Sequence, residues 1–252
     1  MVRQLLACNN VNADEPDRGG RTPLWWASLG GHEGVVRLLL ARDDVNPDKP
    51  SIEGWKPLSQ ASLNGHEAVV RQLLGRDDVN PNKPSNDGTT SLLRASAYGH
   101  EGVVRLLLAR DDVNPDKPNK WDRTPLLEAS FSHVEVVRLL LARDDINPNK
   151  PDFESQAPLW WACSVGNEGI VRQLLARDDI KPDQPDNGGQ SPLWRACYWG
   201  NAGVVRLLLA RDDVDPNKPD NRGQTPLLIA SIRGHMEIVE LLQAQIDAIS
   251  SP

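Results

Sequence analysis

The chain has 252 residues, of which 39% are apolar and 25% charged, enough to form the core of one or two domains. Its 28 basic and 35 acidic residues give a net charge of −7, which argues against a nucleic-acid partner held through phosphate contacts. No apolar run reaches the length of a membrane span or of a signal peptide, and three cysteines (Cys8, Cys163 and Cys197) do not suit a disulfide framework. We therefore expect no membrane contact and an intracellular, cytoplasmic protein.

A segment of about 34 residues recurs along the chain. Its first leucine is found at Leu24, Leu58, Leu92, Leu126, Leu159, Leu193 and Leu227. A period between about 20 and 50 residues is typical of solenoid proteins. We therefore expect a single repeat domain over residues 1–252. It consists of a partial first repeat at 1–21, full repeats at 22–55, 56–89, 90–123, 124–156, 157–190 and 191–224, and a C-terminal capping repeat at 225–252.

Each copy is predicted to contain two short helices and a loop. In the first full copy, Thr22 can cap a helix whose first residue is Pro23, and a Gly-Gly pair ends that helix after about two turns. A second helix follows, with valines and leucines at i, i+4 spacing over residues 35–40. Two prolines then exclude a longer helix or a central strand. The rest of the copy is therefore predicted to form a finger-like loop with a glycine turn.

The middle of the array departs from this pattern. The copy at 124–156 has Ser132 in place of the inter-helix glycine, and Asp122 and Ser155 replace the finger glycine. Two helix starts also lack a capping hydroxyl, which costs about 1 kcal/mol each: Lys56 and Ala157. We therefore expect the array to be least stable at about residues 122–160.

The copies resemble the ankyrin repeat. Residues 22–46 read Thr-Pro-Leu-x-x-Ala-Ser-x-x-Gly-His-x-x-Val-Val-x-Leu-Leu-Leu and end in Asp-Val-Asn, and seven tandem copies follow this pattern. A tetratricopeptide array has the same period, but it needs two longer helices and an aromatic signature that is absent here. The resemblance implies an all-α ankyrin-repeat solenoid of helix-turn-helix units with hairpin-like finger loops, elongated and curved. It also implies a non-enzymatic protein–protein interaction module, or scaffold, that binds a protein partner through its concave face.

The copies also resemble the ankyrin tails of large fungal multidomain signalling proteins. They depart from the ankyrin pattern because the histidine after Thr-Pro-Leu is absent, and because Arg-Asp-Asp and an Asp-Lys-Pro-like insertion follow the second helix. We expect a monomer that forms part of a longer chain. A structural spacer within a larger multidomain protein is the alternative to a binding module.

No group of residues predicts catalysis or metal binding. The five histidines occupy one repeat position at the start of the second helix, where two copies have asparagine, so they are interpreted as turn residues. Cys163 and Cys197 share a small core position in adjacent copies, too far apart for a disulfide. The recurring Arg-Asp-Asp runs are interpreted as structural turns. We therefore expect no catalytic residue, no metal and no cofactor.

Aromatic residues mark a candidate binding surface. Trp25, Trp160 and Trp194 follow the repeat leucine and are predicted to pack in the core, whereas the other nine aromatics fall on positions that vary between copies. The ankyrin resemblance assigns these varied positions to the partner-binding face, where Trp, Tyr and Arg are typical hot spots. The candidate partner-binding residues are Trp26, Trp55, Tyr98, Trp121, Phe131, Trp161, Arg195, Tyr198 and Trp199, with Arg94 and Arg233 as further donors. If the aromatics instead fill grooves between repeats, the array is a spacer.

Four asparagines are candidates for modification. Asn46, Asn80, Asn114 and Asn147 match the asparagine of the ankyrin Asp-Val-Asn motif, which asparaginyl hydroxylases can modify in this family. The resemblance therefore offers a third hypothesis, in which the array is a substrate of hydroxylation.

Overall fold

A computed structural model of the protein describes residues 12–250. These residues form fourteen helices and no strand, which confirms the predicted all-helical fold. Residues 1–11 of the expected partial repeat, including Cys8, lie outside the described residues. The chain divides into two compact units, of which the first ends at Lys120 and the second begins at Trp121.

Each repeat supplies one short first helix and one second helix. The first unit contains α2 (Pro23–Leu29), α3 (Glu33–Leu40), α4 (Pro57–Leu63), α5 (Glu67–Leu74), α6 (Ser91–Ala97) and α7 (Glu101–Leu108). The second unit contains α8 (Pro125–Ala129), α9 (Val134–Leu141), α10 (Pro158–Val165), α11 (Glu168–Leu175), α12 (Pro192–Trp199), α13 (Ala202–Leu209), α14 (Pro226–Arg233) and α15 (Met236–Ser250).

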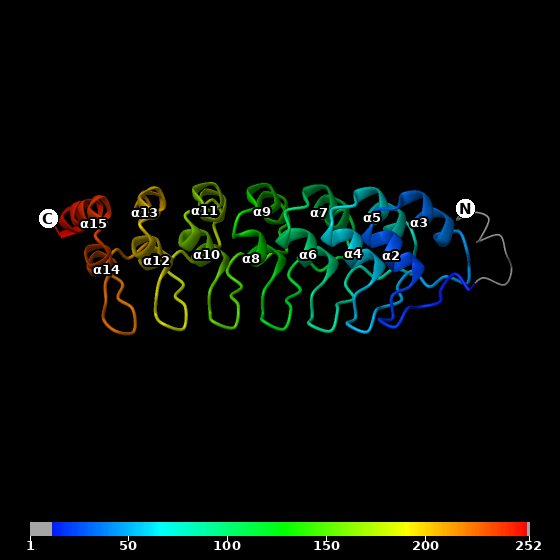
Figure 1. Ribbon diagram of the computed structural model, residues 1–252. Helices are drawn as coiled ribbons and strands as arrows, with labels where there is room; N and C mark the ends of the chain where they lie inside the picture. The colour runs from blue at the N-terminus through cyan, green and yellow to red at the C-terminus, as the bar shows by residue number, and fades with distance from the viewer. Residues whose placement is uncertain (1–11, 251–252) are drawn as a thin grey trace. The chain divides into compact units, whose positions relative to one another are not determined.

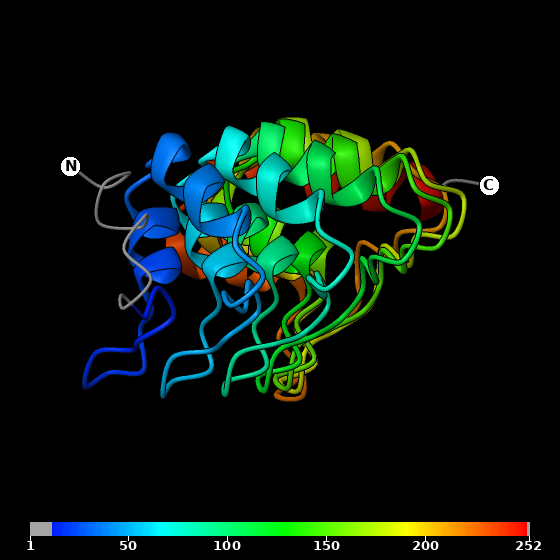
Figure 2. The same cartoon turned by 90° about the vertical axis from the view of Figure 1, so that its right-hand side faces the viewer.

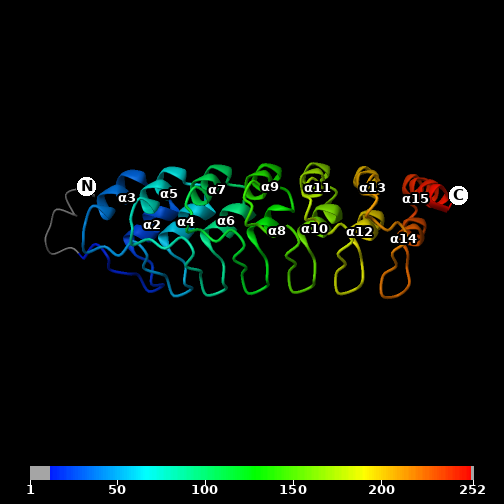
Figure 3. The ribbon, with the colours of Figure 1, turned by 180° about the vertical axis from the view of Figure 1, so that it is seen from behind.

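Within each unit, equivalent helices of successive repeats pack side by side. In the first unit α2, α4 and α6 form one row and α3, α5 and α7 the other (Figure 1). In the second unit α8, α10, α12 and α14 form one row, and α9, α11, α13 and α15 the other. Figure 3 shows the rows from the opposite side, and Figure 2 shows that the fingers extend from the first helices, away from the second helices. The first helices and fingers therefore share one face of each unit.

The first helices begin where the sequence predicts, because a side chain caps them. The Thr22 hydroxyl accepts a hydrogen bond from the Trp25 N–H at 3.1 Å. The same cap occurs at Thr90, Thr124, Ser191 and Thr225. Lys56 and Ala157 make no side-chain cap bond, as the sequence predicts. At Lys56 the Ser59 hydroxyl instead accepts from the Lys56 N–H at 3.0 Å and donates to its carbonyl at 2.8 Å.

Every repeat buries an apolar stripe against its neighbours. In α3 the side chains of Val36 and Leu39 are fully buried, as is Leu24 of α2. Equivalent valine or isoleucine and leucine residues are buried in all the second helices from α3 to α13. Each buried side chain of this size stabilises the fold by roughly 1.5–3 kcal/mol. These second helices span only eight residues each, so they depend on this packing for their stability.

Neighbouring fingers are joined by backbone hydrogen bonds within each unit. The Asn86 N–H, for example, donates to the Glu53 carbonyl at 3.0 Å, and the Asn187 N–H donates to the Glu154 carbonyl at 3.0 Å. The Asn86 side chain adds a bond to the Ile52 carbonyl at 2.9 Å. These bonds fix the position of each finger relative to the next one in the same unit.

The second unit begins with two strained finger turns. Asp122 and Ser155 adopt the left-handed backbone conformation, with φ of 58° and 63°, where the other copies have glycine. The helix that follows Asp122, α8, is also the shortest, with five residues. A side chain in this conformation costs free energy that glycine avoids. This strain supports the expectation that residues 122–160 are the least stable part of the array.

We predict that Asp122→Gly stabilises the protein by about 1 kcal/mol, because it removes the strained side chain from the turn. The measurement is the free energy of unfolding in urea. Gly88→Ala is the matched control at the equivalent turn, where φ is 85° and a Cβ would lie 3.0 Å from the Asn119 Cα; it should destabilise. A lower stability for Asp122→Gly would contradict the prediction.

Candidate functional site

Three buried tryptophans form the base of the candidate surface. Trp25, Trp160 and Trp194 are at most 6% exposed, which confirms their predicted core position. Each indole N–H donates to the backbone carbonyl of the next finger, at Trp55 (3.1 Å), Gln190 (3.1 Å) and Gln224 (3.0 Å). A buried indole needs such an acceptor. These tryptophans therefore tie each first helix to the neighbouring repeat.

In the second unit, five of the nine candidate residues lie together, and we call them the aromatic cluster: Phe131, Trp161, Arg195, Tyr198 and Trp199. The ring centroids of Phe131 and Trp161 are 4.4 Å apart. Trp161 also meets the buried Trp160 edge-on at 5.1 Å, and Tyr198 meets Trp199 edge-on at 5.2 Å. Aromatic pairs of this kind contribute about 0.5–1.5 kcal/mol each beyond their buried area. The rings of the cluster therefore hold one another in place.

Arg195 joins the two ends of the aromatic cluster. Its guanidinium carbon lies 4.3 Å from the centre of the Trp160 ring, 5.4 Å from that of Tyr198 and 5.8 Å from that of Trp199. Cations over aromatic rings at such distances are attracted by the ring electrons. Burial lowers the pKa of Arg195, but a guanidinium remains charged at neutral pH. The aromatic cluster is thus built around a permanent positive charge.

The aromatic cluster is accessible from solvent. Trp199 is 54% exposed, and Phe131, Trp161 and Tyr198 are half-buried. From α14, the guanidinium carbon of Arg233 lies 3.7 Å from the centre of the Tyr198 ring, and this arginine is exposed. The aromatic cluster therefore offers apolar area with two cations beside it.

The other four candidates lie apart from the aromatic cluster. In the first unit, Trp26 packs edge-on against Trp25, Trp55 lies under the Arg94 guanidinium at 3.3 Å, and Tyr98 stacks on His100. In the second unit, Trp121 is an exposed finger residue, and its backbone carbonyl accepts from the Phe153 N–H. Their role in binding stays a prediction.

Sequence analysis missed two polar neighbours of Arg195. The Gln190 side chain of the finger accepts from the guanidinium at 3.3 Å, and the Ser164 hydroxyl of α10 lies 3.4 Å from it. Gln190 carries no distinguishing signal, since Gln156 and Gln224 occupy the same repeat position. Gln190 is close to Arg195 along the chain, whereas the packing of one repeat on the next brings Ser164 to Arg195.

Family models match nearly the whole chain. A model described as ankyrin repeats in three copies matches residues 1–84, 58–152 and 144–220, and a single ankyrin repeat model matches residues 222–250. The chain belongs to the ankyrin repeat family. Ankyrin repeats are in general protein–protein interaction modules, and the family is typically non-enzymatic.

One solved ankyrin structure extends this comparison. The crystal structure of the human ASB11 ankyrin repeat domain matches with a TM-score of 0.73 and 24% identity, over 92% of this chain and 99% of that one. At this identity the likeness shows the ankyrin fold alone. No curated protein matches this chain.

The histidines of these ankyrin repeats form hydrogen bonds between repeats. The Nε2 atom of His66 lies 3.0 Å from the Leu29 carbonyl, and that of His100 lies 2.7 Å from the Leu63 carbonyl. Because a carbonyl only accepts, Nε2 carries the proton in both rings. Among residues 12–250, no three or more His, Cys, Asp or Glu side chains are grouped to hold a metal ion.

The Arg-Asp-Asp turns also link one ankyrin repeat to the next. Arg76 donates two hydrogen bonds to the Asp78 carboxylate, at 3.0 and 2.9 Å, and a third at 2.8 Å to the Leu40 carbonyl at the end of α3. The bonds from Arg76 hold the pKa of Asp78 below its usual value. Arg110, Arg177 and Arg211 repeat all three bonds. These paired carboxylates are therefore structural, as the sequence indicates.

The two described cysteines are not reactive, and the described helices do not suit a membrane span. Cys163 and Cys197 are buried and unpaired, and burial raises the pKa of the Cys197 thiol to about 12, so neither forms a ready nucleophile. No helix within the described part of the chain is both long enough and apolar enough to cross a membrane.

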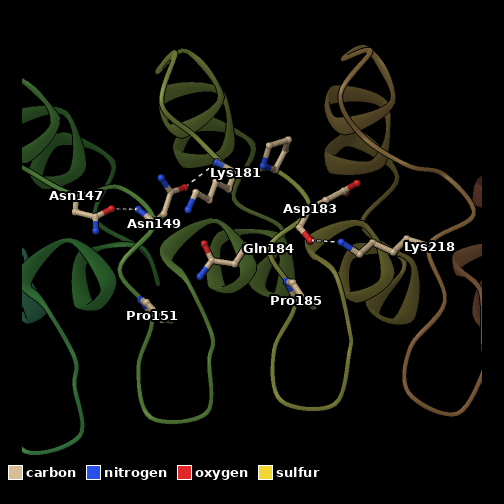
Figure 4. A pocket seen from close by; sticks show the side chains of 9 residues that line it. Asn147, Asn149, Pro151, Lys181, Asp183, Gln184, Pro185 and Lys218 are labelled. Atoms are coloured by element: carbon tan, nitrogen blue, oxygen red, sulfur yellow. Dashed lines mark hydrogen bonds between the residues drawn. The ribbon is translucent and has the colours of Figure 1, made fainter.

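A polar pocket of about 620 Å³ lies at the bases of the fingers in the second unit (Figure 4). Its groups already bond one ankyrin repeat to the next: the Asn149 side chain accepts from the Lys181 N–H at 2.7 Å, and Lys218 donates to the Asp183 carbonyl at 2.8 Å. Burial raises the pKa of Asp183. The pocket contains Asn147 but none of the aromatic candidates, so it is separate from the aromatic cluster.

Proposed function

We propose that the second unit binds a protein partner through the aromatic cluster, on the face formed by the first helices and fingers. In the ankyrin family this is the concave face. Large aromatic side chains supply contact area with few rotatable bonds, so they dominate the energetics of interfaces. The observation that carries the proposal is a set of ring contacts at positions where other copies differ: Phe131 packs on Trp161, and Tyr198 and Trp199 lie beside Arg195.

The exposure of the aromatics favours binding over a purely structural spacer. Trp26, Tyr98, Trp121 and Trp199 are each between 45% and 61% exposed. None of the nine varied aromatics is fully buried, whereas the three tryptophans after the repeat leucine are. In a spacer, apolar side chains would gain most by filling the grooves between repeats. The spacer remains the alternative, and variants of the aromatic cluster separate the two.

We predict that Trp161→Ala and Trp199→Ala each weaken partner binding by about 2 kcal/mol or more, or about 30-fold in Kd. The partner is isolated by pull-down with the full chain, and Kd is measured by calorimetry. Trp199→Ala should keep nearly the original melting temperature, because Trp199 is mostly exposed. Trp161→Ala should lower it modestly, because the half-buried ring loses its contacts with Phe131 and Trp160.

Trp160→Ala is the matched control, since it alters the neighbouring buried ring and should cost about 3–5 kcal/mol of stability. Unchanged affinity per folded molecule in both Trp161→Ala and Trp199→Ala, together with a loss of stability, would contradict the binding proposal and favour the spacer.

The four asparagines are proposed as a separate modification site. Asn46, Asn80, Asn114 and Asn147 are exposed, and each side-chain oxygen accepts from the backbone N–H two residues later, at 2.9–3.0 Å. This turn presents the same side-chain conformation in each repeat. Hydroxylation adds one oxygen, so tandem mass spectrometry of the native protein should find peptides about 16 Da heavier at these asparagines. Unmodified peptides at all four positions would contradict this proposal.

A further inference from the structure

The aromatic cluster carries hydrogen-bond donors that have no acceptor among the described residues. The Nε atom of Arg195 and the indole Nε1 atom of Trp161 are both inaccessible to solvent and make no hydrogen bond there. Buried polar atoms usually have a partner, because leaving one unpaired costs roughly 1–3 kcal/mol. The tryptophans below show the contrast, since Trp160 and Trp194 each have a carbonyl acceptor. Because these two atoms are closed off from solvent, a ligand would reach Arg195 through its two Nη atoms, each of which carries a second N–H beyond the one donated to Gln190 or Ser164.

Arg195 also lacks the carboxylate partner that the arginines of the Arg-Asp-Asp turns have. The arginines at the ends of the second helices each form an ion pair with the aspartate two residues later. No such pair within 4.0 Å involves Arg195 in the part of the chain described, and its two side-chain partners, Gln190 and Ser164, are neutral. Burial lowers the pKa of Arg195, and the charge of Asp186 opposes this effect only in part. The Asp186 carboxylate accepts the N–H groups of Gly188 and Gln190 within its own turn.

The surroundings of Arg195 suit a carboxylate. Its guanidinium carbon lies 4.3 Å from the centre of the Trp160 ring and within 5.8 Å of the centres of the Tyr198 and Trp199 rings, and these contacts restrict the orientation of the group. A guanidinium fixed in this way can donate two parallel hydrogen bonds to one carboxylate, which a lysine cannot do. Half-burial strengthens the attraction, because fewer water molecules screen the charge. Arg233, stacked on Tyr198, adds a second positive charge beside the same site.

We propose that the aromatic cluster recognises an acidic peptide segment, in which a Glu or Asp side chain binds Arg195 and a neighbouring apolar side chain packs on Trp161 or Trp199. This inference rests on the proposed binding function, to which it adds the chemistry of the partner. The chain has a net charge of −7, so its overall charge cannot explain a preference for acidic peptides. Non-specific attraction to this chain favours basic peptides, so a preference for acidic ones must come from the local site.

The test is selection from a phage-displayed library of random 12-residue peptides on the immobilised full chain. The original protein should enrich peptides with Glu or Asp next to an aromatic or aliphatic residue. Arg195→Gln should lose the acidic preference and keep the apolar one. Arg172→Gln is the matched control, because Arg172 is an exposed arginine of α11 that already pairs with Glu168; it should select the same peptides as the original protein.

The strongest enriched peptide and its Glu→Gln or Asp→Asn variant are then compared by fluorescence anisotropy. The neutral peptide should bind the original protein at least tenfold more weakly, and Arg195→Gln should bind both peptides alike. The four affinities, of two proteins for two peptides, form a double-mutant cycle that isolates the interaction between Arg195 and the acidic side chain of the peptide. The comparison of the two peptides on the original protein keeps the test decisive even if Arg195→Gln fails to fold.

The two proposals fail in distinguishable ways. Enriched peptides without acidic residues, or equal binding of the charged and neutral peptides by the original protein, would overturn the acidic-segment inference alone. Selection that is unchanged by Trp161→Ala and Trp199→Ala together would overturn the proposed function as well, because the peptides would then bind elsewhere.

Discussion

Contact between successive repeats is the interaction on which the rest of this structure depends. The first helices, of five to eight residues, and the eight-residue second helices α3 to α13 are too short to be stable in water by themselves, and one helix pair cannot enclose its own valines and leucines. Each repeat therefore gains its stability from the apolar stripe of its neighbour. Polar bonds add to this contact at fixed positions: Arg76 to the Leu40 carbonyl, His66 to the Leu29 carbonyl and Asn86 to the Glu53 carbonyl.

This division of roles leaves some positions free to vary. The residues that form the contacts between repeats recur in nearly every copy, whereas the fifth, eighth and ninth residues from the cap of the first helix do not. In the second unit these positions carry Trp161, Arg195, Tyr198 and Trp199. These side chains are not needed for the contacts between repeats, so they can bind a partner. The buried Trp160 and Trp194 rings pack against Trp161 and Tyr198, respectively.

Sequence reasoning predicts those features that depend on a single repeat. The helix starts at Thr22 and Pro23, the core position of Trp25 and the finger turns all follow from local capping, period and turn chemistry. Contacts between side chains of different repeats do not follow in this way. The pairing of Phe131 with Trp161 crosses from one repeat to the next and depends on how the two pack.

The helix that begins after Lys56 shows the same limit. The sequence predicts the missing cap there, but not the two hydrogen bonds that the Ser59 hydroxyl forms with the Lys56 backbone. Likewise, Trp26 occupies the same repeat position as Trp161 and Arg195, yet it is not part of the aromatic cluster.

The central claim is that the varied first-helix positions, and not the recurring framework, form the binding surface. Hydrogen exchange of the full chain, with and without a peptide selected on it, tests this most directly because it maps protection along the sequence. We expect added protection over α10, α12 and the fingers before them, and little change over α11 and α13. Protection confined to α11, α13 and the Arg-Asp-Asp turns would contradict the account.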